Sequence, residues 1–267
     1  MDIYNCHLHL FTIKHVPDRF LPPCLMYLAK HGWSRRALTW ILRHFDPLSK
    51  RNIFERYARF IKITADKSQA DTFEIVRSYY PTGTRFVVLP MDMSLMGAGE
   101  VAENIFKQHK ELAAVRDRFP DLIFPFAAVD PRRSDVPKVL VHAVCEMKFK
   151  GVKLYPPLGY RPDDPTLVDF VYPFCLEHDI PVTAHCSRGG VCEKGKPDSA
   201  ANSDPDLWRP VLEKYPDLKL CLAHFGGIDA WRNYLDSPWP QEQPLPAPDN
   251  WLAKIIDMIR SGKYPNL

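Results

Sequence analysis

Hydrophobic positions follow two patterns along this chain. Short runs rich in apolar and β-branched residues alternate with longer stretches in which apolar residues recur every three or four positions. Runs of the first kind are typical of strands, and stretches of the second kind are typical of helices. The predicted strands cover residues 3–10, 85–90, 122–129, 151–155, 180–185 and 218–224. The predicted helices cover residues 35–45, 53–63, 101–119, 136–147, 167–177, 207–215 and 251–260.

From the second strand onward, each predicted strand is joined to the next through a predicted helix. Strands that are apolar on both faces and alternate with helices indicate a parallel sheet covered on both sides. An open doubly wound sheet and a closed (β/α) barrel both have this plan. No G-x-G-x-x-G turn follows the first strand, which removes the main argument for a dinucleotide-binding sheet. We interpret residues 12–78, which contain no predicted strand, as a helical insertion that caps a site within a single domain, 1–267.

The placement of polar residues favours the barrel, because barrel chemistry gathers at the C-terminal ends of several strands. Polar residues with ligand or proton-transfer chemistry lie on or directly after all six predicted strands: His7 and His9, Asp92, Asp130, Lys153, His185 and His224. The other histidines fall in predicted helices or loops, and we expect them to be surface residues: His15, His31, His44, His109, His142 and His178.

Composition limits the possible functions. The 267 residues are 46% hydrophobic, enough to bury a sizeable core, and the 26 prolines argue against an all-helical protein. The formal charge of +3 comes from interleaved acidic and basic residues, so no nucleic-acid surface is expected. No apolar run is long enough to span a membrane. Seven scattered cysteines without a C-x-x-C pair or a leader are typical of reduced thiols in the cytoplasm.

His7 and His9 form the clearest chemical motif. Side chains two positions apart share one face of a strand, so the two imidazoles should point the same way and could donate to one divalent metal. The alternative is two polar residues on the wet face of an edge strand. Cys6 and Cys186 should point away from their histidine neighbours by strand alternation, and we do not expect either to be a nucleophile.

Four stretches give the chain its resemblance to a known family: residues 5–9, 149–156, 181–186 and 218–227. In this order and spacing, the chain resembles the amidohydrolase superfamily, in particular its amidohydrolase-2 (amidohydrolase-related) group. The resemblance implies an α/β fold, a (β/α)8 TIM barrel with metal at the C-terminal mouth. It implies that His7, His9 and His185 are metal ligands. It also implies that His224 supports the ligands or handles protons, and in some members it binds a metal.

The sequence departs from the family pattern at its end. The family has an aspartate after strand eight that binds the metal and acts as general base, whereas this chain stops where strand seven would begin. Asp229, Asp236 and Asp257 come too soon after the sixth strand to replace it. We therefore expect an incomplete barrel without strands seven and eight. Such a barrel would expose strand edges and apolar surface, which predicts a homo-oligomer or a damaged domain.

Three neutral imidazoles suit zinc, although cobalt, manganese and iron also fit such ligands. Zinc lowers the pKa of its bound water from about 15.7 to about 7. Because the family base is missing, His224 is the best remaining proton acceptor and our candidate catalytic residue. For substrate binding we name Lys153, Arg188, Tyr155 and Asp92. Lys153 has two further possible roles, namely a carboxylated lysine that bridges two metals, as in some superfamily members, and a plain ion-pair partner inside the barrel.

These observations predict a metal-dependent hydrolase. It would act on a small, carboxylated substrate with a C–N or C–O bond, through a metal-activated water. The alternative within the same family is a non-oxidative decarboxylase (a lyase) of aromatic or unsaturated acids. An alternative from another class is a catalytically silent scaffold built on the truncated barrel.

Overall fold

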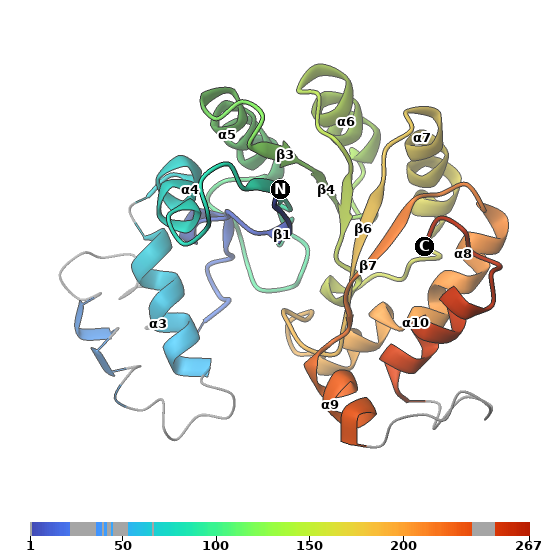
Figure 1. Ribbon diagram of the computed structural model, residues 1–267. Coiled ribbons are helices and arrows are strands. Elements are labelled where there is room, and N and C mark those ends of the chain that lie inside the picture. Colours follow the sequence, from blue (N-terminus) through green and yellow to red (C-terminus); the bar gives the residue numbers. More distant parts are fainter. Residues whose placement is uncertain are drawn as a thin grey trace. The chain divides into compact units, whose positions relative to one another are not determined.

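The computed structural model describes residues 2–21, 36–38, 40, 41, 44, 53–65, 67–236 and 249–267. The chain divides into two compact units, Met1–Pro125 and Phe126–Leu267. Each unit contains its own parallel sheet with helices packed beside it (Figure 1).

Unit 1 contains a three-stranded parallel sheet in the order β1-β2-β3. Its strands are β1 (Tyr4–Leu8), β2 (Arg85–Val88) and β3 (Ile123–Pro125). Its helices are η1 (Ile13–His15), α3 (Ile53–Thr64), α4 (Gln69–Arg77) and α5 (Ile105–Arg118). Ser68 and Asn104 cap the N-termini of α4 and α5, each accepting a backbone N–H with its side chain, as residues of these types commonly do.

An aromatic cluster joins the helices of unit 1 to its sheet. Phe73 of α4 is fully buried and packs against Phe86 of β2, with ring centroids 5.3 Å apart, and against Phe119 at 5.0 Å. Leu112 on the buried face of α5 is also fully inaccessible. The apolar spacing along the helices therefore places one face of each on the sheet.

Unit 2 contains a four-stranded parallel sheet in the order β4-β5-β6-β7. Its strands are β4 (Ala127–Val129), β5 (Val152–Leu154), β6 (Val182–Ser187) and β7 (Leu220–Gly226). Its α- and π-helices are α6 (Val136–Leu140), η4 (Val141–Glu146), η6 (Leu167–Val171), α7 (Tyr172–Glu177), α8 (Arg209–Lys214), α9 (Ile228–Asp236) and α10 (Trp251–Arg260). Its 3-10 helices are η5 (Pro156–Leu158), η7 (Pro197–Ser203) and η8 (Pro205–Trp208).

The register of this sheet places Lys153 and Thr183 side by side in one row across the strands. Ala128 pairs with Lys153, Lys153 with Thr183, and Thr183 with Cys221. Side chains that pair across a parallel sheet point to the same face, and so does a residue two positions further along. His185, two residues after Thr183, therefore shares the face of Lys153.

The six predicted strands are all present, and one of them is divided in two. The strand predicted at 122–129 is broken at Phe126 into β3 and β4, directly after Pro125. Proline has no N–H to continue a ladder, which is consistent with β3 ending there. Helix α9 was not predicted. Of the helix predicted at 35–45, residues 36–38, 40, 41 and 44 are described and are helical, and the other positions lie outside the described residues. The capping insertion at 12–78 and the single-domain organisation stay predictions.

The prediction that six histidines are surface residues is wrong for two of them. His15 and His109 are buried, with 1% and 0% of their surfaces exposed. His109 lies one helical turn after Ile105 and shares the buried face of α5. His15 is buried because it belongs to the first turn of η1, where its ring accepts a hydrogen bond from the Thr12 N–H. His44 and His178 are exposed, His142 is half-buried, and His31 lies outside the described residues.

Among the residues that the structure describes, no helix is long and apolar enough to cross a membrane. The last described residues lie beside the first residue of β7, since Leu220 N–H donates to Asn266 O at 2.9 Å.

Gly151, directly before β5, allows close packing at the edge between β4 and β6. A Cβ at this position would lie 2.6 Å from the Phe126 ring and 2.8 Å from Pro181 O. We expect Gly151→Ala to lower the free energy of unfolding by about 1–3 kcal/mol, as overpacking does. Gly189→Ala is the control, because its Cβ would meet only Ser187 Oγ at 3.6 Å. Equal losses in both variants, measured by denaturant unfolding, would contradict the packing argument.

Candidate metal centre

His7 and His9 face each other at the end of β1. Their Nε2 atoms are 3.1 Å apart, which confirms that the two rings share one face of the strand. His9 Nδ1 lies 2.6 Å from Leu89 O, and a carbonyl can only accept a hydrogen bond. His9 therefore carries its proton on Nδ1 when neutral, and its Nε2 presents a lone pair toward His7.

The separation between these two nitrogens suits ligation. Zinc–nitrogen bonds of about 2.0–2.1 Å in a tetrahedral site place two ligand atoms about 3.3 Å apart. The contact of His9 with a backbone carbonyl is also typical, because metal-bound histidines usually donate their other ring N–H to an oxygen acceptor. The His7–His9 pair thus fits a divalent metal by distance, and His9 fits it by tautomer as well.

His185, on β6 in unit 2, shows the complementary tautomer. Its Nε2 lies 2.8 Å from Gly189 O and 3.2 Å from Ser187 O, so this nitrogen carries the proton. Its Nδ1 is then a lone-pair acceptor, and it is buried without a hydrogen-bond partner in the described structure. Burial, and then the charges of Lys153 and His224, lower the pKa of His185 to about 3. A neutral ring with a buried lone pair that accepts no hydrogen bond is suited to metal ligation.

Tyr155 supports the His185 ring from one side. The rings stack with centroids 4.3 Å apart, and the Tyr155 hydroxyl accepts a hydrogen bond from Val191 N at 3.1 Å. Burial raises the pKa of Tyr155 to about 12, so the phenol stays protonated. Gly190 has φ +115°, and a Cβ there would clash with the Tyr155 hydroxyl. The loop can approach these two rings closely because it has glycine at this position.

Lys153 is the most unusual charged residue of unit 2. Only 1% of its surface is exposed, and its Nζ has no hydrogen-bond partner in the described structure. The Nζ lies 5.7 Å from the centre of the Tyr155 ring. Burial lowers the pKa of Lys153 from 10.5 to about 7. A buried amine in this state is well suited to accept an anionic partner or a covalent modification.

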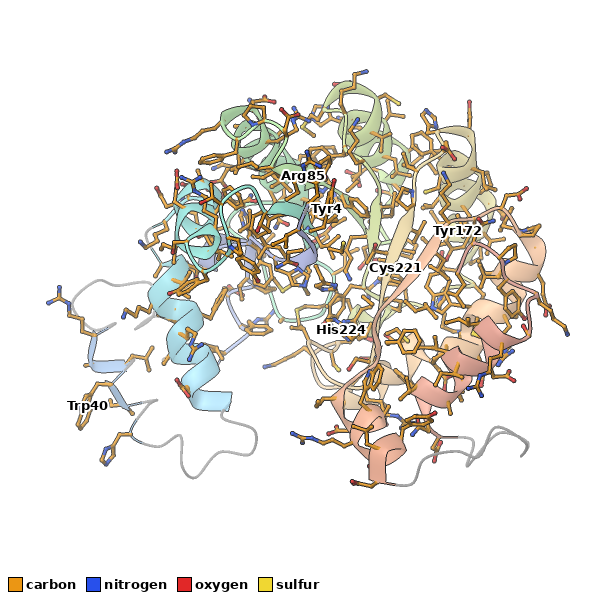
Figure 2. All side chains as sticks on the ribbon, viewed as in Figure 1. Tyr4, Trp40, Arg85, Tyr172, Cys221 and His224 are labelled. Carbon is orange, nitrogen blue, oxygen red and sulfur yellow. The ribbon has the colours of Figure 1, made fainter. Side chains whose placement is uncertain are left out.

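His224 lies at the end of β7, where the strand leads into α9 (Figure 2). Its ring meets that of His185 edge to face, with centroids 4.7 Å apart. Although the residue is exposed, partial burial of the ring and then the Lys153 charge lower its pKa. His224 and Phe225 have φ values of +68° and +47°, in the left-handed region that non-glycine residues rarely occupy. Such strain is concentrated at functional sites.

The structure thus brings the predicted residues together in two groups. His7 and His9 meet in unit 1, and Lys153, Tyr155, His185 and His224 gather in unit 2. Arg188 instead pairs with Asp249 at 3.6 Å and stacks over Trp251 at 5.0 Å.

Two of the remaining predicted residues, Asp92 and Asp130, have local partners. Asp92 is buried, and its carboxylate accepts hydrogen bonds from the Ser94 N–H and hydroxyl at 3.1 and 2.6 Å. Asp130 is buried and holds Arg132 through two hydrogen bonds of 2.9 and 2.6 Å. Burial raises the pKa of Cys186 to about 12, in keeping with the expectation that it is not a nucleophile.

A second cluster was missed by the sequence analysis. His15, Glu103 and Glu111 bring three possible ligand atoms within 4.8 Å of one another, with His15 Nε2 3.4 Å from Glu103 and 3.9 Å from Glu111. However, the Thr12 N–H donates to Nδ1 at 2.9 Å, so the neutral ring carries its proton on Nε2. A protonated nitrogen offers no lone pair to a metal. In this tautomer the His15 Nε2–H points at the two carboxylates. No sequence motif could have indicated the cluster, because Glu103 and Glu111 lie far from His15 in the sequence.

The parallel α/β sheets and the histidines at strand ends define a protein of the TIM-barrel class. The family model for amidohydrolases (Amidohydro_2) matches residues 4–247, and the chain belongs to this family. No curated protein gave a significant match.

Solved structures share the fold at low sequence identity. A TIM-barrel protein of Bordetella bronchiseptica is 18% identical, with a TM-score of 0.50 over 100% of this chain and 74% of that chain. The 2,6-dihydroxybenzoate decarboxylase of Rhizobium is 15% identical, with a TM-score of 0.51 over 91% of this chain and 75% of that chain. The 4-oxalomesaconate hydratase of Rhodopseudomonas palustris is 18% identical, with a TM-score of 0.46 over 86% of this chain and 64% of that chain. The last two are enzymes.

The buried His15 should make stability depend on pH. Burial lowers the pKa of His15, even though Glu111 and Glu103 oppose the shift. The unfolded chain therefore takes up this proton near pH 6.5, before the folded chain does, and stability is lost as the pH falls. His15→Gln removes the titration. We expect the stability advantage of the wild type over this variant to shrink from about pH 8 to about pH 5 in denaturant titrations. An advantage that grows on acidification would mean that the glutamates stabilise a protonated ring.

Proposed function

We propose that this amidohydrolase-family protein is a metal-dependent hydrolase of small, carboxylated substrates with a C–N or C–O bond. The observation that carries the proposal is the protonation pattern of the candidate ligands. Backbone carbonyls hold one ring N–H of His9 and one of His185, which leaves His9 Nε2 and His185 Nδ1 as lone-pair donors. Such an arrangement is typical of histidines that bind metal ions.

His7, His9 and His185 would hold the metal, with zinc as the first candidate for a set of imidazole ligands. When bound, a divalent metal would supply Lewis-acid polarisation of a carbonyl oxygen and a water of lowered pKa. Because the candidate ligands belong to different units, the proposal requires histidines from both, and this requirement can be tested directly.

The chain's own residues would provide proton transfer and substrate binding. His224 has a lowered pKa and is therefore neutral near pH 7, so a ring nitrogen can accept a proton during the reaction. Lys153 would pair with a substrate carboxylate in surroundings from which water is largely excluded. Tyr155 would keep the His185 ring in place through the stacking contact. Arg188 and Asp92 stay candidates for further substrate contacts.

A decarboxylase reaction is the alternative, and one solved structure with the same fold carries that activity in its name. The likeness at 15% identity supports the fold and leaves the reaction to experiment. We also propose that the chain forms a homo-oligomer, because β1 and β7 are each the outer strand of a sheet in the described structure. Equilibrium sedimentation measures this property independently of activity.

Metal binding should depend on histidines from both units. We expect purified protein to hold about one divalent ion per chain, and His9→Ala and His185→Ala each to weaken zinc or manganese binding by at least about 100-fold, since each removes a direct ligand. Elemental analysis and calorimetric titration provide the measurements. His142→Ala is the control, because this histidine pairs with Glu146 on the surface and should leave binding unchanged. Unaltered metal affinity in His185→Ala would remove the unit 2 ligand from the proposal.

Substrate preference should reveal the role of Lys153. We expect hydrolysis of amides or lactones that carry a free carboxylate, and slower hydrolysis of the corresponding methyl esters. Lys153→Met should raise KM for the carboxylated compounds about tenfold or more, because a hydrogen bond to a charged group is worth about 1.5–3 kcal/mol. The methyl esters serve as the matched control and should show little change.

Other outcomes of the same assay would change the assignment. Release of carbon dioxide from aryl acids without hydrolysis would make the protein a decarboxylase. Absence of both reactions together with absence of bound metal would indicate a silent scaffold. An added carboxyl group on Lys153, seen in the intact mass, would indicate the metal-bridging role instead of substrate binding.

A further inference from the structure

Cys145 and His178 form a thiol–imidazole pair on the outer side of unit 2. Cys145 lies in η4 and His178 directly follows α7, with Sγ and Nε2 3.5 Å apart. Cys145 is half-buried and His178 is exposed. η4 leads into the start of β5 and α7 into the start of β6, so the pair lies at the opposite end of these strands from His185 and His224. The metal centre proposed above does not use it.

The protonation state of His178 is fixed by the backbone. Its Nδ1 lies 3.0 Å from Phe174 O, so this nitrogen donates, and in the neutral ring Nε2 is left as an acceptor facing the thiol. The ring also stacks on Phe174, with centroids 4.0 Å apart and planes 20° from parallel. A nucleophile, a base within hydrogen-bond reach and a third group that orients the base are the three parts of an activated nucleophile.

The fully buried cysteines of unit 2 contrast with Cys145. Burial raises the pKa values of Cys175 and Cys186 to about 12, which keeps them as unreactive thiols. Cys145 combines solvent access with a base positioned to remove its proton. Cys192 and Cys221 of the same unit are also accessible to solvent, so selective reaction at Cys145 would come from its histidine neighbour and not from exposure alone.

We propose that Cys145 is a modification site that reacts with hydroperoxides, with His178 as its base. His178 Nε2 takes the thiol proton, and the sulfur attacks the terminal oxygen of the hydroperoxide. The S–O bond forms as the O–O bond breaks, and the leaving oxygen takes the proton from His178. The products are a cysteine sulfenic acid and an alcohol, or water when the oxidant is hydrogen peroxide. Sulfur loses two electrons and the peroxide bond gains them.

The test treats the full chain with hydrogen peroxide at neutral pH and traps sulfenic acid with a dimedone probe, followed by peptide mass spectrometry. We expect Cys145 to react at least about fivefold faster than Cys6, which is more exposed and serves as an internal reference. His178→Gln should bring Cys145 down to the rate of Cys6, because glutamine can accept a hydrogen bond but cannot hold the thiol proton. His142→Gln, altered elsewhere in η4, is the matched control and should react like wild type.

A second measurement separates reactivity from damage to the fold. Iodoacetamide labelling in denaturant should give equal rates for Cys145 in wild type and His178→Gln, and the difference should be present only in the folded chain. If folded wild type and His178→Gln react at the same rate, the Cys145–His178 hydrogen bond is merely structural and the proposal is overturned. A Cys145 that reacts no faster than Cys6 in the folded wild type would overturn the proposal as well.

Discussion

Parallel pairing of strands is the constraint on which the arrangement of polar residues depends. In a parallel ladder, residues that pair across neighbouring strands point to the same face, and all strands end at the same edge. The pairing of Lys153 with Thr183 and of Thr183 with Cys221 therefore fixes where His185 must project. The cost of burying Lys153 follows from the same geometry, since its position in the row places the amine among residues that exclude water. The sheet thus sets both the position and the electrostatic state of this group.

Backbone carbonyls also determine which ring nitrogen carries the proton in three of the histidines. Leu89 O does so for His9, Gly189 O for His185 and Phe174 O for His178. In these three cases the opposite nitrogen is left as an acceptor. His15 is the reverse case, because it receives a backbone N–H and must direct its own N–H outward. The difference explains why three histidines are suited to binding or proton transfer, whereas His15 is suited to holding its loop against two glutamates.

The sequence allowed much of the fold to be predicted and rather less of the site. Strand positions, the shared face of His7 and His9, and the bounds of α10 follow from periods of two and 3.6 residues, which are local properties. The break at Phe126 and the burial of His15 rest on local contacts, at Pro125 and at the Thr12 N–H, that these periods do not reveal. The carbonyl that orients each histidine is equally invisible in the sequence, because loop geometry decides which oxygen reaches the ring. The pairing of Cys145 with His178 needs two helical segments to lie side by side, and no motif indicates it.

The left-handed backbone at His224 limits how this position can change during evolution. Histidine, asparagine and aspartate tolerate such a conformation far better than β-branched or bulky residues do, and glycine adopts it without penalty. A related protein could therefore exchange a neutral proton acceptor for a carboxylate here without rebuilding the turn. Valine, isoleucine or threonine would instead force the chain to find another route from β7 into α9. The backbone conformation of this turn therefore allows several kinds of side chain at position 224 and excludes β-branched ones by steric clash alone.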